Sequence, residues 1–217
     1  MIAAIVPAKA LDGAKTRLAA LLTEDERRCL ALAMLADVLR TLQTVPRLDR
    51  IAVVSPDNEV LARARELGAE ATLEPPSVRG INQALDHAVD VMSPRGMRAL
   101  LVVLADVPAV APGDIESVLD ALPTDSGVVI CPSSAAGTSA LAMIPPGAIP
   151  FRFGARSFAA HKRECADRGL AAEVVRIDSL ERDIDEPDDL RWLISRAAET
   201  ATHHVLAQLR ITERLEA

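Results

Sequence analysis

The sequence predicts a three-layer α/β/α sandwich with a mostly parallel sheet and a small antiparallel insertion. Short aliphatic runs alternate with longer stretches of helical period along most of the chain, which is the rhythm of βαβ units. The run at 100–104 is apolar at every position, so both faces of that strand are expected to be buried, as in a parallel sheet covered by helices. The length of 217 residues favours a single domain spanning 1–217.

The first half of the chain carries three strand–helix pairs. We predict strands at 2–6, 51–54 and 71–73 and helices at 24–43, 57–67 and 81–92. Thr23 and Glu26 have the spacing of a capping box before the first helix, and Pro56 is expected at the first helical position of the second.

The second half keeps the rhythm with one interruption. We predict strands at 100–104, 128–131, 139–144 and 173–177 and helices at 113–122, 157–168 and from Pro187 onward, with Pro187 in the first helical turn. The segment 131–157 is rich in Pro and Gly and has two strand-like pieces in succession, which predicts an antiparallel insertion beside the main sheet that shapes a substrate pocket. The polar, Ala-rich segment 196–217 is expected to be a helical tail that packs on the body or on a partner.

Composition excludes several classes of function. The net charge of −7 disfavours a general grip on nucleic acid or anionic lipid, and three Phe, one Trp and no Tyr disfavour a base-stacking platform. The longest apolar run, 99–105, is far shorter than the ~20 residues of a membrane span. With no basic region before the first strand, we expect a cytoplasmic protein. Its three cysteines have no disulfide or zinc spacing, and we expect them to be reduced and buried.

A basic loop follows the first predicted strand, where ligands of parallel sheets bind. Lys9, Lys15 and Arg17 lie there with Gly13 between them, a set suited to holding phosphates. The loop matches neither Gly-x-x-x-x-Gly-Lys-Ser/Thr nor Gly-x-Gly-x-x-Gly, which disfavours a P-loop NTPase and a Rossmann dehydrogenase. A solvated basic loop is the alternative interpretation.

Carboxylates follow two other elements. Asp106 ends the most apolar strand, where its charge is costly to bury unless a cation or hydrogen-bond donors meet it. Mg²⁺ is one such cation, and a turn or capping role is the alternative. Asp188 and Asp189 complement the dipole of the last helix and need no functional explanation. We take Asp183 and Asp185 to point to opposite faces and expect only Asp185 to reach Asp106.

Neutral groups that bind anions occur in two further segments. Thr138 and Ser139 follow Gly137 in the first segment. In the second, Gly154 and Ser157 lead into a helix whose free N–H groups would bind a carboxylate or a phosphate. Together they are suited to hold a small acid, although an N-cap is the alternative role for Ser157.

The titratable residues do not form the catalytic sets that nucleophilic hydrolysis requires, so the sequence disfavours that reaction. We expect His161 on a solvated helix face. No Ser/His/Asp or Cys/His set with a plausible arrangement emerges from the sequence, and Gly-x-Ser-x-Gly does not occur.

Taken together, these motifs resemble the 2-phospho-L-lactate guanylyltransferase family, with its phosphoenolpyruvate and 3-phosphoglycerate guanylyltransferase variants, in the MobA-like nucleotidyltransferase superfamily. The resemblance runs from Ile2 to about Leu193. It rests on Val-Pro-Ala-Lys9, Lys15-Thr-Arg17-Leu, Asp106-Val-Pro, Gly137-Thr138, Phe153-Gly154-x-x-Ser157-Phe-x-x-His161 and Asp183-Ile-Asp185-x-Pro-x-Asp188-Leu.

The resemblance implies a reaction and roles for these residues. GTP and a phosphorylated three-carbon acid would give a guanylylated acid and pyrophosphate, a step in the biosynthesis of the deazaflavin coenzyme F-420, and family members commonly form dimers. By this resemblance, Lys9, Lys15 and Arg17 bind the triphosphate, and Gly80 and Asn82 position guanine or ribose. Asp106 and Asp185 hold Mg²⁺, and the acceptor's carboxylate binds to Thr138, Gly154 and Ser157. The resemblance implies that the catalytic residues are Lys9, Lys15, Asp106 and Asp185.

One departure from the family concerns the acceptor. Asn often follows the Gly-Thr pair in the family, and a Leu-rich strand follows it, whereas this chain has Ser139 and Ala142-Met143 there. We therefore expect Ser139 and Met143 to contribute to the choice among 2-phospholactate, phosphoenolpyruvate and 3-phosphoglycerate.

The chemistry of the residues agrees with these roles. The attacking phosphate oxygen is already anionic near neutral pH, because the second pKa of a phosphate is ~6, so no general base is needed. Repulsion between two polyanions is the obstacle, and fixed cations remove it. Two alternatives stay open at this point. Asp183-x-Asp185 also fits the metal motif of sugar-nucleotide glycosyltransferases, and a nucleotide-binding or scaffold protein without activity is the other.

Overall fold

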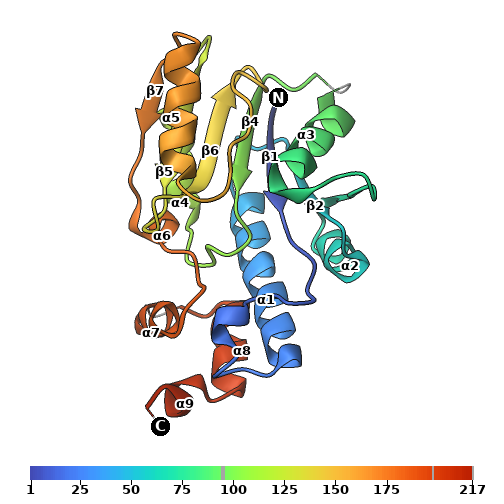
Figure 1. The fold of residues 1–217 in the computed structure, drawn as a ribbon, viewed down its shortest axis with the longest axis vertical. Helices are drawn as coiled ribbons and strands as arrows, with labels where there is room; N and C mark the ends of the chain where they lie inside the picture. Colours follow the sequence, from blue (N-terminus) through green and yellow to red (C-terminus); the bar gives the residue numbers. More distant parts are fainter. Residues whose placement is uncertain (94–95, 197, 217) are drawn as a thin grey trace.

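A twisted sheet with the strand order β3-β2-β1-β4-β6-β5-β7 forms the centre of the computed structural model, which describes residues 1–93, 96–196 and 198–216 (Figure 1). Every paired strand is parallel to its neighbour except β6, which runs antiparallel to both β4 and β5. The strands are β1 (Ile2–Pro7), β2 (Arg50–Ser55), β3 (Glu70–Leu73), β4 (Ala99–Val103), β5 (Gly127–Pro132), β6 (Thr138–Ile144) and β7 (Ala172–Val174).

Helices cover both faces of this sheet. They are the short 3-10 helix η1 (Thr16–Leu18), α1 (Glu24–Gln43), α2 (Asn58–Glu66), α3 (Gly80–Met92), α4 (Pro112–Asp120), α5 (Ser157–Asp167), α6 (Asp178–Glu181), α7 (Pro187–Ser195), α8 (Ala201–Gln208) and α9 (Ile211–Glu216). Side chains of α1, α2, α4 and α6 share one core with the strands, and those of α3 and α5 share another on the opposite face. The predicted three-layer sandwich is therefore confirmed.

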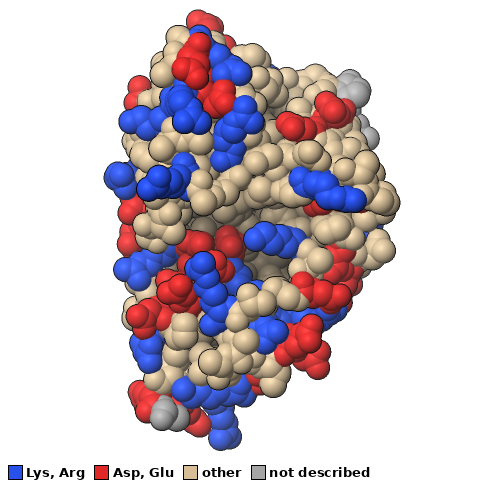
Figure 2. Space-filling view, in the orientation of Figure 1, with Lys and Arg blue, Asp and Glu red and all other residues tan. Residues whose placement is uncertain are grey.

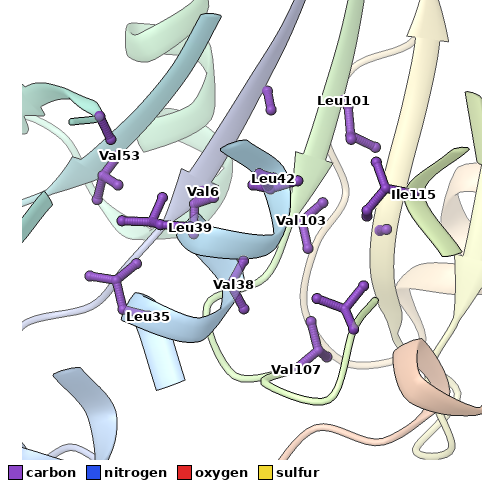
Figure 3. Packing of buried hydrophobic residues seen from close by; sticks show 14 of the residues in the cluster. Val6, Leu35, Val38, Leu39, Leu42, Val53, Leu101, Val103, Val107 and Ile115 are labelled. Atoms are coloured by element: carbon purple, nitrogen blue, oxygen red, sulfur yellow. The ribbon is translucent and has the colours of Figure 1, made fainter. Parts of the chain in front are cut away.

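The α1 side of the core shows why the strands are apolar throughout. Leu35, Leu39 and Leu42 of α1 face strand residues such as Val6 and Val103 (Figure 3). All are buried, and burying an aliphatic side chain of this size contributes about 2 kcal/mol. Neighbouring strand residues such as Ile5 and Val102 point to the other face. A strand covered on both faces is thus apolar at each position rather than at every second one.

The antiparallel strand lies inside the sheet, which corrects the prediction of an insertion beside it. β6 sits between β4 and β5, with Val103 opposite Ala140 and Leu100 opposite Met143. Because β6 runs antiparallel to β4, its amino end lies at the carboxyl end of β4. Thr138 is thereby placed beside the residues that follow β4.

The C-terminal tail packs on its own chain. Leu206 and Ile211 share a buried cluster with Leu18, Leu30 and Met34, at the end of the molecule away from α3 and α5 (Figure 1). The buried carboxylate of Asp37 on α1 accepts hydrogen bonds from the first turn of α8. Within this segment, α8 and α9 therefore pack on the body of the protein, and residues 197 and 217 of the predicted tail lie outside the described residues. Formation of a homodimer stays a prediction, and Leu206 and Ile211 are not free to serve it.

Two predicted helix starts are confirmed and one is wrong. Thr23 and Glu26 form the reciprocal capping box of α1, and Pro187 opens α7. The second helix does not begin at Pro56, because the carboxylate of Asp57 caps the N–H of Glu59 and α2 begins at Asn58.

The prediction that all three cysteines are buried also needs correction. Cys131 and Cys165 are buried, but Cys29 is exposed. In the part of the chain that the structure describes, no helix has the length and hydropathy needed to cross a membrane.

Candidate active site

The charged residues predicted for the site gather at the carboxyl ends of β1 and β4. Figure 2 shows a hollow in the middle of the face of the molecule that it presents, with acidic side chains on one side and basic side chains around it. The hollow lies where the ribbon of Figure 1 brings the loop after β1 close to the segments after β4 and α6. Ligands of open parallel sheets bind at this edge, because the strand ends leave a crevice there.

The loop after β1 is held in a fixed conformation. Gly13 has φ +71°, a left-handed conformation that favours glycine, and Lys15 itself has φ 48°. The N–H of Leu11 donates to a carboxylate oxygen of Asp57 at 2.9 Å, which ties the loop to the start of α2. A non-glycine residue in this conformation costs about 1 kcal/mol, so the fold must hold Lys15 against that strain.

Lys15 bridges two of the predicted catalytic carboxylates. Its Nζ lies 3.1 Å from Asp106 Oδ2 and 2.8 Å from Asp185 Oδ1. The Lys15 side chain is only 9% exposed. Its burial by itself would lower its pKa, but the charges of Asp106 and Asp185 outweigh that and raise it. Burial raises the pKa of Asp185, and the Lys15 ammonium overcomes this and holds that pKa below its usual value. Lys15 and Asp185 are therefore both charged at neutral pH.

Asp183 joins the same cluster, which overturns the expectation that only Asp185 would reach Asp106. One oxygen from each of Asp106, Asp183 and Asp185 lies within 4.8 Å of the others. Side chains two positions apart in an extended segment share a face, and the buried Ile184 between them turns the other way into the core. The N–H of Ile184 also donates to the Asp106 carbonyl at 3.0 Å. Burial, with the neighbouring Asp106 and Asp185, raises the pKa of Asp183.

The donors of this cluster fit a divalent cation with a preference for oxygen. Among the described residues, Asp106 Oδ1 is a buried oxygen without a hydrogen-bond partner. Such an orphan costs free energy unless something meets it. Three carboxylates form a set that Mg²⁺ can accept together with phosphate oxygens. Asp106, Asp183 and Asp185 are thus the residues that could hold Mg²⁺.

Lys9 and Arg17 flank the cluster from exposed positions. The guanidinium of Arg17 lies 3.3 Å from a carboxylate oxygen of Glu186. Positive charge from both Arg17 and Lys9 helps to lower the pKa of Asp185, so both side chains act electrostatically on the cluster. Their solvent exposure leaves them free to meet a polyanion.

The predicted nucleotide residues at the start of α3 lie in two different settings. Gly80 is exposed, with φ +75°. The side-chain amide of Asn82 exchanges two hydrogen bonds with the backbone of Phe153, at 2.7 and 3.0 Å. Asn82 therefore fastens α3 to the loop before α5. Contact of Asn82 with guanine or ribose stays a prediction. It would use the hydrogen-bonding capacity of the amide that the pairing with Phe153 does not use.

Thr138 begins β6 and Ser157 begins α5, and the two residues lie near the same corner. Both are buried, and Ser157 Oγ lies 3.7 Å from the point that a Cβ on Gly137 would occupy. Ser157 is the first residue of α5 rather than its N-cap, which is Arg156. Gly154, with φ +132°, lies in the exposed loop leading into this helix.

Sequence reasoning missed His161, which is fully buried instead of solvated. Its Nδ1 is 3.0 Å from Thr138 Oγ1, and its Nε2 accepts the N–H of Arg152 at 3.0 Å. Ser157, His161 and Cys165 are spaced by four, and this stripe marks the inner face of α5. That spacing is the signal that could have placed His161 inside.

The two residues expected to choose the acceptor are both buried in β6. Ser139 Oγ donates to the carbonyl of Cys131 at 3.2 Å, so the hydroxyl proton is used inside the sheet. Met143 is fully buried and lies opposite Leu100, at the other end of β4 from the site. The expected contribution of Met143 is therefore not a direct contact at this edge of the sheet, and a contribution from Ser139 stays a prediction.

Solved structures share this fold. A protein from Desulfovibrio desulfuricans described as a nucleotide-diphospho-sugar transferase superposes with a TM-score of 0.77, covering 98% of this chain and 97% of its own, at 14% sequence identity. The chain therefore shares the fold of that protein, and its acidic cluster lies at the carboxyl edge of the sheet.

Sequence comparison gives the family of this chain. Residues 2–217 match the family described as guanylyl transferase CofC like, and the chain belongs to this family. It is 42% identical over 195 residues to a phosphoenolpyruvate guanylyltransferase from Sphaerobacter thermophilus, covering 89% of this chain and 93% of that one. It is 35% identical to a 2-phospho-L-lactate guanylyltransferase from Methanothermobacter thermautotrophicus, covering 96% and 91%. The resemblance found in the motifs is confirmed.

Proposed function

We propose that this protein transfers GMP from GTP to a small phosphorylated three-carbon acid and releases pyrophosphate. The observation that carries the proposal is the cluster of Lys15, Asp106, Asp183 and Asp185 at the carboxyl edge of the sheet, in a chain of the guanylyl transferase family. A bond forms between an oxygen of the acid's phosphate and the α-phosphorus of GTP. The bond from that phosphorus to the bridging oxygen of pyrophosphate breaks.

In this proposal the basic side chains bind the triphosphate. Lys9 and Arg17 are exposed at the rim and meet the outer phosphates, while Lys15, with its side chain 9% exposed, acts close to the reacting phosphorus. Because the attacking phosphate is anionic, the chain needs no residue to remove a proton. The task of these residues is to hold two mutually repelling anions in line.

Asp106 and Asp185, with Asp183 beside them, would hold Mg²⁺. The ion supplies positive charge to the phosphates and so favours displacement of pyrophosphate. The fit of the donor set and the orphan oxygen of Asp106 support this assignment.

The acceptor's carboxylate is proposed to bind at the neutral corner formed by Thr138, Gly154 and Ser157, beside the main chain of Ser139. Gly80 and Asn82 are proposed to lie on the guanine or ribose side. Phosphoenolpyruvate is the first acceptor to test, because the relative at 42% identity is named for it. A relative from Colwellia psychrerythraea, 30% identical, is named for 3-phospho-D-glycerate, so the choice of acid varies among these proteins.

We further propose that the product is the guanylylated precursor of coenzyme F-420, made in the cytoplasm by a homodimer. Support for the pathway comes from the family.

The test is release of pyrophosphate from GTP and Mg²⁺ with each of the three acids, with mass spectrometry of the adduct. We expect pyrophosphate and a guanosine diphosphate adduct in equal amounts. Release of a nucleoside diphosphate from a sugar nucleotide, without pyrophosphate, would instead indicate a glycosyltransferase. Binding of GTP unaffected by Mg²⁺, with no turnover, would indicate a nucleotide-binding protein without activity.

A further inference from the structure

His161 has hydrogen-bond partners that fix where its proton lies. The backbone N–H of Arg152 donates to Nε2 at 3.0 Å, so Nε2 carries a lone pair and no proton. A neutral imidazole then has its proton on Nδ1, and this N–H donates to Thr138 Oγ1 at 3.0 Å. Burial lowers the pKa of His161 to about 4, with the Arg152 charge acting in the same direction, so the neutral form is the one present at pH 7.

This arrangement leaves the hydroxyl proton of Thr138 without an acceptor. The Thr138 oxygen accepts from His161, so its own O–H points elsewhere, and within the described residues it has no other hydrogen bond. Thr138 is only 2% exposed. A buried donor without an acceptor costs free energy, which an oxygen atom of a ligand would recover.

The hydroxyl of Ser157 is also without an acceptor in the part of the chain that the structure describes. It has no hydrogen-bond partner among the described residues, and it lies on the same face of α5 as His161, one turn earlier. Two hydroxyl donors from β6 and α5 thus stand at one corner. A carboxylate, which offers two acceptor oxygens, is the small group that matches them.

We infer that His161 is a positioning residue for the acceptor acid, because its N–H to the Thr138 oxygen forces the Thr138 hydroxyl to act as a donor to the acid's carboxylate. This inference rests on the proposed function and adds to it a residue that does not touch the substrate. Without the imidazole, the Thr138 hydroxyl would be free to rotate and to act as an acceptor, which would repel a carboxylate.

The surroundings of His161 keep it in place. The ring of Phe153 packs edge-on against it, with centroids 5.0 Å apart. Glu164, three residues further along α5, pairs with the Arg152 guanidinium at 2.7 Å and with Arg168. The carboxylate of Glu164 is therefore committed to two arginines, and the imidazole is left to the backbone of Arg152 and to Thr138.

Two amide variants separate the halves of this network. The side-chain nitrogen of His161→Asn can stand where Nδ1 stands and donate to Thr138, whereas His161→Gln reaches the position of Nε2 and loses that donor. We expect His161→Gln to raise the KM for the acid ~10-fold, the loss of one hydrogen bond, with kcat and the KM for GTP changed less than ~2-fold. His161→Asn should recover most of the affinity. His204→Gln, at an exposed histidine of α8, is the matched control and should behave as wild type.

A double-mutant cycle tests whether His161 acts through Thr138. Thr138→Val should raise the KM for the acid at least ~10-fold, Thr138→Ser should raise it little, and adding His161→Gln to Thr138→Val should have almost no further effect. Equal and additive effects of the two changes would overturn the inference while the proposed function stands. If the wild type makes no guanylyl adduct with any of the acids, both fail.

Nitrogen-15 NMR of the wild-type imidazoles gives a readout that needs no variant to fold. We expect the His161 ring at pH 7 to be neutral with its proton on Nδ1. A ring protonated on Nε2, or on both nitrogens, would contradict the inference.

Discussion

The site has a charged half and a neutral half, and they are built differently. In the charged half, Asp106 and Asp185 remain 28% and 37% exposed and are held by ion pairs to Lys15. In the neutral half, Thr138 and His161 are buried, and their hydrogen bonds fix the tautomer of the histidine and leave one donor free. Partly solvated charges can rearrange around an incoming triphosphate and cation. A buried network of hydrogen bonds accepts only a group of the right size and polarity.

The largest expected effect is in the charged half. Asp106→Asn should lower kcat at least ~100-fold, because it removes a main electrostatic contribution to binding the cation. Steady-state rates of pyrophosphate release measure this. Asp188→Asn is the matched control, since Asp188 is 88% exposed and pairs only with Arg191 among the described residues. Equal rates for Asp106→Asn and Asp188→Asn would contradict the assignment.

Loss of the bridging cation should come second. Lys15→Met removes the ammonium between two carboxylates and should lower kcat/KM for GTP roughly 30-fold, less than for Asp106→Asn because Lys9 and Arg17 remain at the same edge. Lys162→Met is the control, because Lys162 is exposed and lies over the ring of Phe158. If the KM for the acid rose and the kinetics with GTP did not change, Lys15 would belong to the other half of the site.

In the neutral half, His161 should make the free energy of unfolding depend on pH. The pKa of His161 is about 4 in the folded protein against 6.5 for the free side chain, so the fold favours the neutral ring. This stabilisation is complete above pH 6.5 and is lost as the pH falls from 6.5 towards 4. Each pH unit in that window is worth about 1 kcal/mol, so between pH 7 and pH 5.5 the wild type should lose about 1 kcal/mol more than His161→Gln.

Urea unfolding at those two pH values measures the difference between the two proteins. Carboxylates that titrate in the same range are shared by both, so their contribution cancels. The same slope of unfolding free energy with pH in wild type and variant would mean that the ring is already protonated in the fold.

The smallest effect is expected at Ser139. Its hydroxyl donates to the Cys131 carbonyl, so Ser139→Ala should change the relative rates with the three acids less than ~2-fold, although the loss of this bond should lower the free energy of unfolding by about 1 kcal/mol. Competition between the acids in one reaction gives the relative rates directly. A change of acid preference as large as that of Thr138→Val would show that Ser139 itself contacts the acceptor.

Local patterns account for most of what could be predicted. The run 100–104 and its neighbours gave the layered fold, because a strand covered on both faces must be apolar throughout. Thr23 and Glu26 gave the start of α1, because capping depends on groups three residues apart. Asp106 could be selected because a charged side chain directly after an apolar strand needs a partner, and the structure brings Lys15 and Asp185 together with it.

What the sequence by itself determined is the chemistry of the edge: which charged and neutral groups follow each strand. Only the tertiary structure decided how they combine. The position of β6 inside the sheet set Thr138 beside the end of β4, the turn of Ile184 into the core brought Asp183 to Asp106, and the packing of α5 buried His161. The reason is physical: periodicity and capping act over a few residues, whereas burial and the pairing of distant strands are set by contacts between segments far apart in the chain.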